Sequence, residues 1–438
     1  VDSDGRLCAP KPIHMIKPNA TKEPESHGHT YKNNVLEQDL SVFKMVVESV
    51  KEGIRAGINP ERISQGTSGS YFMKGIDGRT IGVFKPKEEE PYSQMNPKWS
   101  KWLHRTCCPC CFGRSCIMVG VGYVSEVAAS VVDRFLSLDM VPRTEIVELA
   151  APTFYYTLLE RWQAHNRRQS MKEMDGSEQP YSFYRGKFGS FQLFANDFRP
   201  AIKIFRELEG LPEMPTSLID AIHGEFERLV VLDYVIRNTD RGLDNLLMRI
   251  DWVAADGTFR TQPGFTKMRP IVKMAAIDNG LAFPYKHPDN WRSYPYGWSS
   301  MEPYIHRPFS EALRGHLLKL LENRETWDDL EDQLRMVFRI DVDFREKHFQ
   351  RQMSVFRGQL RNLLEVLRRP GGGSPADLLQ MEPMLIQEEQ DYLRDVKKSR
   401  RAFPPGEPIV GVFDDEDTTH GHPRWRRPVT NKPWLEKF

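Results

Sequence analysis

Apolar residues recur at helical spacing in several stretches of the chain. Residues 35–50, 125–138 and 349–367 place apolar side chains about three or four positions apart, which predicts amphipathic helices. Ser125 is the predicted N-cap of the second of these helices. Residues 226–237 are apolar around most of their circumference, so we expect this helix to be buried.

Shorter apolar runs predict strands. Tyr71–Phe84 reads as a hairpin because Asp77-Gly78 separates two short apolar runs. Residues 146–149, 191–194 and 271–277 are further predicted strands. The strands cluster in the first half and the helices in the second, which predicts a two-lobed α+β arrangement. Its expected parts are a strand-rich lobe over 35–195, a helical lobe over 196–395, an insertion at about 88–118 and a polar variable insertion at 161–187.

Composition narrows the class of protein. Lys+Arg number 61 and Asp+Glu 60, a net charge of +1, which argues against a nucleic-acid partner. No apolar run is long enough for a spanning helix, and residues 1–22 lack the apolar core of a secretory signal. Residues 1–34 and 396–438 are polar or proline-rich and charged, so we expect them to be disordered. Five of six cysteines lie between 107 and 116, unlike a secreted disulfide framework, which indicates the reducing cytosol.

The first chemical signal is a glycine and hydroxyl-rich segment at the start of the hairpin. Residues 64–70 include Gly66, Ser68, Gly69 and Ser70, and such a segment lets backbone N–H groups approach phosphate oxygens. The alternative is an ordinary tight turn. Lys85 ends the following apolar run and is placed to reach ATP phosphates, although it is also compatible with a surface lysine.

The second signal follows the predicted buried helix. Asp240 and Asn245 are five positions apart, which is the spacing of the aspartate and the metal-binding asparagine in kinase catalytic loops. Asp278-Asn279-Gly280 then follows an apolar strand, where kinases place an aspartate that holds Mg²⁺. Each could be a polar turn by itself. Their order along the chain, after the glycine segment and Lys85, indicates a kinase-like site.

A kinase-like site also needs a carboxylate for the lysine and a hinge for the nucleotide base. Glu126 is the candidate partner of Lys85, with Asp133 as its rival, and both are equally compatible with a solvated helix face. Residues 191–194 are the candidate hinge, where the backbone near Gln192 and Phe194 would hold adenine, unless the segment is simply a core strand.

The cysteine cluster is the most unusual segment. Cys107, Cys108, Cys110 and Cys111 lie within a basic stretch that also carries aromatic residues. Zinc would need a distant second pair of ligands, and redox chemistry could use either Cys-x-x-Cys spacing. Acylation places lipid chains beside basic and aromatic groups, and we favour it because stable anchoring needs both. The expected membrane-contact residues of this stretch are Lys98, Trp99, Lys101, Trp102 and Arg105.

Several of these motifs together resemble the type II phosphatidylinositol 4-kinases. They are Ser64–Phe72, Val83–Lys87, Asn96–Trp99, Cys107–Arg114, Gly189–Phe194, Phe226–Tyr234, Arg237–Gly242, Ala275–Phe283 and His287–Arg292. The similarity runs from about Ser64 to about Gln390. That family usually has Asn and Trp at the positions of Leu243 and Leu246.

The resemblance implies a kinase-like fold and transfer of the ATP γ-phosphoryl group to the 4-hydroxyl of phosphatidylinositol. By matching position, Lys85 contacts ATP, Asp240 acts at the hydroxyl, and Asp278 with Asn245 holds Mg²⁺ or Mn²⁺. Trp291 matches an aromatic residue near the membrane-facing surface.

The family is palmitoylated in its cysteine cluster. A lipid-anchored, peripheral enzyme on the cytoplasmic face of Golgi, endosomal or vacuolar membranes is therefore expected. Two other hypotheses remain at this point. One is a membrane-tethered pseudokinase scaffold, and the other is a protein kinase, which the missing His-Arg-Asp and Ala-Pro-Glu motifs disfavour. The sequence does not identify protein partners.

Overall fold

A computed structural model describes residues 27–64, 69–90, 115–175, 183–211, 213–253, 259–260, 268–288, 293–387 and 425–426. The chain forms two compact units, Val1–Met45 and Val46–Phe438. Helix α1 spans His27–Arg55, so residues 27–34 are helical where we predicted disorder. Extending a formed helix by a turn requires far less free energy than nucleating one, so polar residues can continue an amphipathic helix.

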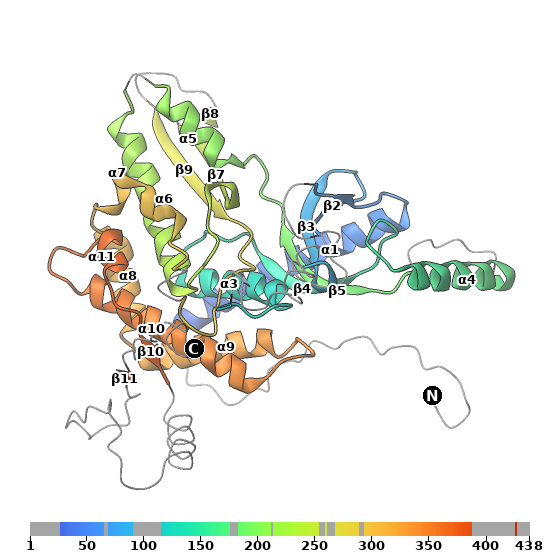
Figure 1. Ribbon diagram of the computed structural model, residues 1–438. Helices are drawn as coiled ribbons and strands as arrows, with labels where there is room; N and C mark the ends of the chain where they lie inside the picture. The colour runs from blue at the N-terminus through green and yellow to red at the C-terminus, as the bar shows by residue number, and fades with distance from the viewer. Residues whose placement is uncertain are drawn as a thin grey trace, which may run out of the picture. The chain divides into compact units, whose positions relative to one another are not determined.

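The first sheet contains five antiparallel strands in the order β1-β2-β3-β5-β4 (Figure 1). Its strands are β1 (Glu61–Arg62), β2 (Tyr71–Lys74), β3 (Thr80–Pro86), β4 (Thr144–Leu149) and β5 (Lys187–Leu193). The predicted hairpin is confirmed as β2 and β3, and the two predicted strands as β4 and β5. Close packing of β3 on β5 requires Gly82, because a Cβ there would lie 2.2 Å from the ring of Phe191.

Helix α3 (Gly122–Leu136) lies between β3 and β4 in the chain and begins earlier than predicted. Its N-cap is Val121, which makes no side-chain cap, so Ser125 is not the N-cap. The Ser125 hydroxyl instead donates to the carbonyl of Val121 from inside the first turn, 3.2 Å away. Local sequence placed the cap wrongly because the groups that satisfy this helix end come from a distant part of the chain, as shown below.

The second sheet is built around β7 (Leu246–Val253), which pairs antiparallel with β6 (Arg199–Pro200), β8 (Phe259–Arg260) and β9 (Arg269–Ala276). Strand β9 confirms the strand predicted at 271–277. The helices of this region are α5 (Ala201–Glu209), α6 (Thr216–Val235), α7 (Glu302–Ile305), α8 (Glu311–Leu321), α9 (Arg324–Phe338), α10 (Glu346–Leu367) and α11 (Pro375–Leu379). A strand-rich N-terminal region and a helical C-terminal region confirm the predicted kinase-like α+β class.

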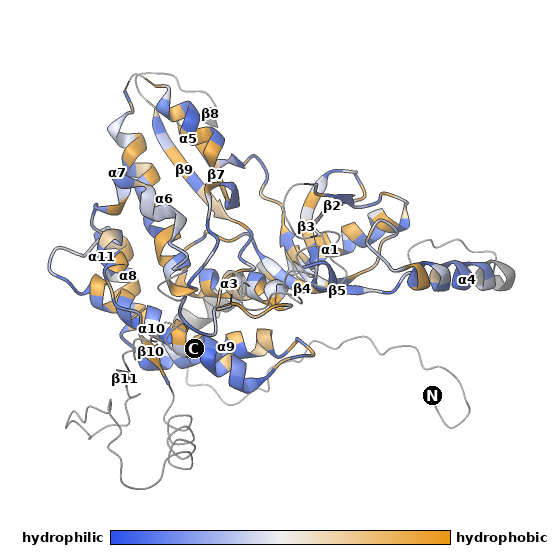
Figure 2. Ribbon diagram, viewed as in Figure 1, coloured by the Kyte–Doolittle hydropathy of each residue, from blue (hydrophilic) through white to orange (hydrophobic). Residues whose placement is uncertain are grey.

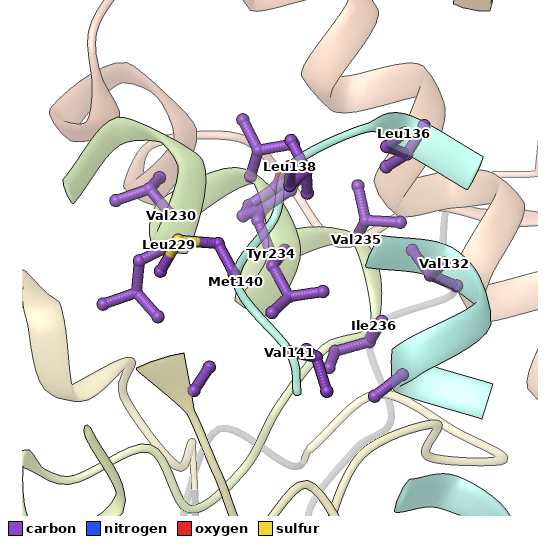
Figure 3. Packing of buried hydrophobic residues seen from close by; sticks show 14 of the residues in the cluster. Val132, Leu136, Leu138, Met140, Val141, Leu229, Val230, Tyr234, Val235 and Ile236 are labelled. Atoms are coloured by element: carbon purple, nitrogen blue, oxygen red, sulfur yellow. The ribbon is translucent and has the colours of Figure 1, made fainter. Parts of the chain in front are cut away.

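One hydrophobic core joins α3 to the predicted buried helix, which is confirmed within α6. Figure 3 shows Val132 and Leu136 of α3 beside Val235 of α6, with Tyr234 and Leu138 in the same cluster. All five residues are at most 3% exposed. Because dense packing transmits displacement, this core fixes the helix that carries Glu126 relative to the helix that leads to Asp240.

Two segments depart from the expected pattern. The polar insertion contains helix α4 (Leu158–Asp175), which Figure 2 shows as largely hydrophilic beyond its first turn. Within the predicted disordered tail, β11 (Trp425–Arg426) pairs with β10 (Leu385–Ile386). Proline and charge argue against a core, yet backbone pairing uses groups that every residue except proline carries in full. Among the described residues, no helix has the length and apolarity needed to cross a bilayer.

Candidate active site

Lys85 is the centre of the site. Its Nζ lies 2.5 Å from Oε1 of Glu126 and 2.7 Å from Oδ1 of Asp278. These partners come from α3 and from the turn after β9, 41 and 193 positions away in sequence. The rival carboxylate, Asp133, is directed elsewhere and accepts a hydrogen bond from the Met140 backbone N–H at 2.8 Å. The fold thus brings Lys85, Glu126 and Asp278 together and leaves Asp133 in the core.

The three charged groups differ in their access to water. The side chain of Glu126 is 3% exposed and that of Lys85 is 17% exposed, whereas that of Asp278 is 49% exposed. Burial opposes the charge of Lys85, but the two carboxylates outweigh it and raise the Lys85 pKa. Lys85 in turn holds the pKa of Asp278 below its usual value. Burial raises the pKa of Glu126 despite the ion pair with Lys85. Lys85 therefore keeps its positive charge, and the half-exposed Asp278 is the partner that solvent or a ligand can reach.

The pairing of β7 with β9 positions Asn245 next to the Asp278 turn. Leu246 at the start of β7 lies opposite Ala276 at the end of β9. The next residue on each side continues the contact, since the Ile277 N–H donates to the Asn245 carbonyl at 3.1 Å. Asp278 follows in the left-handed region with φ 57°, a conformation that is unfavourable for a residue other than glycine and is often retained at functional sites.

Asp240 projects from a loop that its neighbours hold closed. Nδ2 of Asn245 donates to the Asp240 carbonyl at 3.0 Å, and the Asp240 N–H donates to Oδ1 of the buried Asn238 at 2.9 Å. Asp240 itself is exposed. The structure therefore brings Asp240 and Asn245 into one loop, as their spacing predicted, with the Asp240 backbone restrained and the residue open to solvent.

Arg241 is a central residue that the sequence reasoning missed. Its buried guanidinium makes a bidentate ion pair with Asp233 of α6, with distances of 3.0–3.1 Å. It also donates to the carbonyls of Asn245 at 2.8 Å and Ile277 at 2.6 Å, and to the side chain of Asn279. One side chain thus ties α6, the Asp240 loop and the Asp278 turn together. A signal was present, because Asp233 is an acidic residue within an otherwise apolar helical stretch.

The helix that carries Glu126 is capped from outside itself. The Glu90 carboxylate accepts hydrogen bonds from the backbone N–H groups of Gly122 at 3.1 Å and Tyr123 at 2.5 Å. These are the first residues of α3, whose N–H groups have no partner within the helix. Negative charge is also favourable at this end of the helix dipole. Glu90 thereby links the end of the Lys85 strand to the helix that bears its partner.

The glycine segment is only partly described, since Gly66 and Ser68 lie outside the described residues. Gly69 donates its N–H to the Glu89 carbonyl at 2.9 Å, and a Cβ at this position would lie 2.3 Å from Oε2 of Glu89. Ser70 is only 6% exposed, and its carbonyl accepts the Ile63 N–H at 2.8 Å. Ser70 is therefore part of the strand packing through its carbonyl, and its contact with phosphate stays a prediction.

The candidate hinge is also engaged within the sheet. The side chain of Gln192 is buried and donates to the Thr144 hydroxyl at 3.0 Å. The Phe194 N–H donates to the Ile81 carbonyl at 3.1 Å, and its carbonyl accepts the Asn196 N–H at 3.1 Å. Phe194 therefore extends the backbone pairing of β5, and the adenine-binding role of this segment stays a prediction.

The remaining predicted residues lie outside the described part of the chain. They are Lys98, Trp99, Lys101, Trp102, Arg105, Cys107, Cys108, Cys110, Cys111 and Trp291. Within the described residues, no group of three or more His, Cys, Asp and Glu side chains is arranged to hold a metal ion.

Comparisons with known proteins identify the family of this chain. The family model for phosphatidylinositol 3- and 4-kinase matches residues 66–366. Phosphatidylinositol 4-kinase type 2-alpha of Danio rerio is 44% identical over 349 residues, covering 79% of this chain and 77% of that protein. Phosphatidylinositol 4-kinase type 2-beta of Xenopus tropicalis is 40% identical over 384 residues, covering 85% and 77%.

A solved structure of the Golgi casein kinase with Mn and ADP bound aligns with a TM-score of 0.36 at 13% identity, over 73% of this chain and 77% of that one. A likeness at that level carries no weight. The family match and the identity to the two relatives are the evidence that assigns the family. The chain belongs to the type II phosphatidylinositol 4-kinases of the phosphatidylinositol 3- and 4-kinase family.

Proposed function

We propose that this protein transfers the γ-phosphoryl group of ATP to the 4-hydroxyl of phosphatidylinositol. The observation that carries this proposal is the contact of Lys85 with both Glu126 and Asp278, next to the loop of Asp240 and Asn245. Relatives that are 40–44% identical bear the name phosphatidylinositol 4-kinase type 2. Phosphoryl transfer depends on positioning and charge stabilisation, and this cluster supplies both.

Lys85 is suited to bind the phosphates of ATP. Glu126, buried on α3, holds the ammonium group from one side, while the half-exposed Asp278 occupies the other. Phosphate oxygens that replace Asp278 would preserve the charge balance around Lys85, because one anionic partner is exchanged for another. The buried Glu126 contact keeps the lysine oriented during this exchange.

The residues fit a divalent cation with oxygen ligands. Asp278 offers a carboxylate, and the amide oxygen of Asn245 lies on the opposite side from the Nδ2 that donates to Asp240. Both are ligands that Mg²⁺ accepts, and Mn²⁺ is the alternative that the same donors permit. When bound, such a cation offsets the negative charge of the transferring phosphates. Asp240, exposed on its restrained loop, would accept a hydrogen bond from the inositol hydroxyl and orient it for attack.

The direct test is a product assay with labelled ATP, Mg²⁺ and vesicles that contain phosphatidylinositol. We expect labelled phosphatidylinositol 4-phosphate, identified by comparison with standards phosphorylated at other hydroxyls. Label on a peptide array in place of lipid would support the protein kinase hypothesis. Membrane binding without turnover would support the pseudokinase scaffold, and either result would overturn the proposed reaction.

We also propose that acylation of Cys107, Cys108, Cys110 and Cys111 anchors the protein to Golgi, endosomal or vacuolar membranes from the cytoplasmic side. Basic and aromatic residues surround these cysteines in the sequence, and lipid chains with a basic patch give stable attachment. Anchoring would raise the effective concentration of enzyme at its lipid substrate. Replacing the four cysteines by serine is expected to move the protein to the soluble fraction and to remove incorporation of a labelled fatty acid. An unchanged membrane fraction would contradict the anchor.

A further inference from the structure

The turn between α9 and α10 exposes apolar side chains. We define the α9–α10 turn as residues 336–347, which include the last residues of α9 and the first of α10. Met336 is 65% exposed, Ile340 is 53% exposed and Val342 is 90% exposed. Phe338, within the same stretch, is 4% exposed in the core, so this turn carries both a buried apolar anchor and exposed aliphatic side chains. Aliphatic side chains this exposed within a few residues of one another favour an interacting surface.

We propose that the α9–α10 turn contacts the membrane directly, inserting Ile340 and Val342 into the interfacial region of an anionic bilayer. This inference rests on the proposed function, in that it assigns a further membrane-facing element to an enzyme acting on a lipid. The occupant is inferred from the position of the turn and from its charge.

The position of the turn is fixed by ion pairs to the start of the proposed acylated segment. Nζ of Lys87 lies 2.9 Å from Oδ2 of Asp341 and 3.2 Å from Oδ2 of Asp343. The hydroxyl of Tyr123, in the first turn of α3, donates to Oδ2 of Asp341 at 2.9 Å. Lys87 stands three residues before Glu90, the last described residue before the cysteine-containing stretch. The turn is therefore held where that stretch leaves the described chain.

The other end of the same stretch is tied to a second proposed membrane element. The Tyr285 N–H donates to the Cys116 carbonyl at 3.0 Å, and the Tyr285 hydroxyl donates to the Ser115 carbonyl at 2.6 Å. Tyr285 lies six positions before Trp291 in the sequence. Described residues at both ends of the cysteine-containing stretch thus connect it to the α9–α10 turn on one side and to the approach to Trp291 on the other. A bilayer that meets the cysteines would be close to the turn.

The turn carries both signs of charge, because Arg339, Arg345 and Lys347 are matched in number by Asp341, Asp343 and Glu346. Lys87 pairs with two of these carboxylates and leaves one basic group in excess. Arg345 and Lys347 are exposed beside the apolar residues. Burial, and then the positive charges of Arg345, Arg351 and Lys347, lower the pKa of the neighbouring His348. The carboxylates of Asp341 and Asp343 are paired with Lys87 and so repel anionic lipid less than free carboxylates would. Apolar side chains flanked by basic ones are the composition that binds bilayer interfaces.

The test is vesicle flotation of the full chain in the unacylated state, using vesicles of phosphatidylcholine and phosphatidylinositol. The variant Ile340→Glu/Val342→Glu is expected to lower the partition coefficient by at least about tenfold, equivalent to about 1.4 kcal/mol. The matched control is Ile76→Glu, a residue in the β2–β3 turn with the same 53% exposure as Ile340. We expect the control to partition like the unchanged protein. Equal partitioning of turn variant and unchanged protein, or an equal loss in the control, would overturn the proposal.

A gain-of-function variant guards against misfolding of the charged one. Val342→Trp should raise the partition coefficient severalfold, because tryptophan favours the bilayer interface and the position is exposed in the folded protein. No increase, in a variant whose unfolding transition is unchanged, would contradict the proposal. Sedimentation of the same variants tests the alternative that the turn contacts a second copy of the chain. A variant that loses self-association but binds vesicles like the unchanged protein would overturn the membrane assignment.

Failure of this inference is distinguishable from failure of the proposed function. In detergent micelles containing phosphatidylinositol, insertion into a bilayer is not required, so the turn variants should phosphorylate lipid at the rate of the unchanged protein. Micelle activity with unaltered vesicle partitioning would overturn the turn proposal alone. Absence of micelle activity in the unchanged protein would overturn the kinase proposal, while the flotation result would still decide the role of the turn.

Discussion

Two lysine–glutamate pairs in the same region of this protein have different surroundings. Lys187 at the start of β5 pairs with Glu89 at 3.0 Å, and both side chains are 0% exposed. Lys85 at the end of β3 pairs with Glu126 at 2.5 Å, and its second carboxylate, Asp278, is 49% exposed. The two lysines come from adjacent strands of one sheet.

Both charged groups of the Lys187–Glu89 pair make further contacts with neighbouring residues. Lys187 also donates to the Tyr155 carbonyl and lies 4.9 Å from the centroid of the Tyr156 ring. Glu89 also accepts from the Tyr71 hydroxyl at 2.8 Å and from the Tyr155 N–H at 3.2 Å. Water has no access to either charged group, so the pair can only be structural. The comparison teaches that a lysine–glutamate pair becomes available for chemistry when one of its partners faces solvent and can be exchanged.

The largest expected effect is on catalysis at Lys85, the lysine whose second carboxylate, Asp278, faces solvent. Asp278→Ala should lower the rate of lipid phosphorylation by about 10³-fold or more, because it removes the carboxylate proposed to hold the cation that offsets the charge of the phosphates. The free energy of unfolding should change by less than about 1 kcal/mol, since the Asp278 side chain is half exposed. The labelled-ATP product assay and urea unfolding measure the two quantities. Retained activity, or a large loss of stability, would show that Asp278 belongs with the structural pair.

The buried Lys187–Glu89 pair should give the opposite result, a large loss of stability with little change in the rate of lipid phosphorylation. Lys187→Met leaves the buried carboxylate of Glu89 without its cation and should lower the free energy of unfolding by about 3–5 kcal/mol. Adding Glu89→Gln should restore part of this loss, because it removes the uncompensated charge. Urea unfolding measures the stabilities, and the folded fraction should phosphorylate lipid at close to the normal rate. A variant with normal stability but no activity would contradict the distinction drawn between the pairs.

The smallest expected effect concerns Glu90, which joins the two regions by capping α3. Burial raises the Glu90 pKa from 4.5 to about 7, although the N–H groups of Tyr123 and Gly122 oppose the shift. At pH values between 4.5 and about 7, Glu90 is therefore protonated in the folded state and ionised in the unfolded state. The contribution to stability is therefore present at low pH and is lost as pH rises to about 7.

The contribution of Glu90 is isolated by measuring the free energy of unfolding of the unchanged protein and of Glu90→Gln below pH 4.5 and above about pH 7. The unchanged protein should lose about 2 kcal/mol more than the variant as pH rises across this range. The variant is the necessary control, because burial also raises the Asp133 pKa to about 7 and acts with the same sign in both proteins. Equal pH dependence in the two proteins would exclude Glu90 as the titrating group.

Much of this arrangement could be predicted from local pattern. Periodicity identified α6 and α10, and alternating runs with a turn between them identified the β2–β3 hairpin. The spacing of Asp240 and Asn245, and Asp278 after an apolar strand, selected three residues that the fold places beside Lys85 or in the adjoining loop. Such signals are readable because helix, strand and turn chemistry depend on neighbouring residues.

Other features were missed because their partners are remote in sequence. Ser125 was assigned a cap that Glu90 supplies from 32 and 33 positions before the capped residues. The Phe194 N–H extends the pairing of β5 by its contact with the Ile81 carbonyl, a partner that the local sequence does not specify. Arg241 was given no role, although it joins three segments of the site.

The amino-acid sequence alone determined which side chains could perform phosphoryl transfer and in what order they occur, because those properties belong to residue type and spacing. Only the tertiary structure decided which lysine has an exchangeable partner, which of two carboxylates meets Lys85, and which loop stands at the ends of the cysteine-containing stretch. These outcomes depend on burial and on contacts between segments up to 256 positions apart, and no local pattern specifies them.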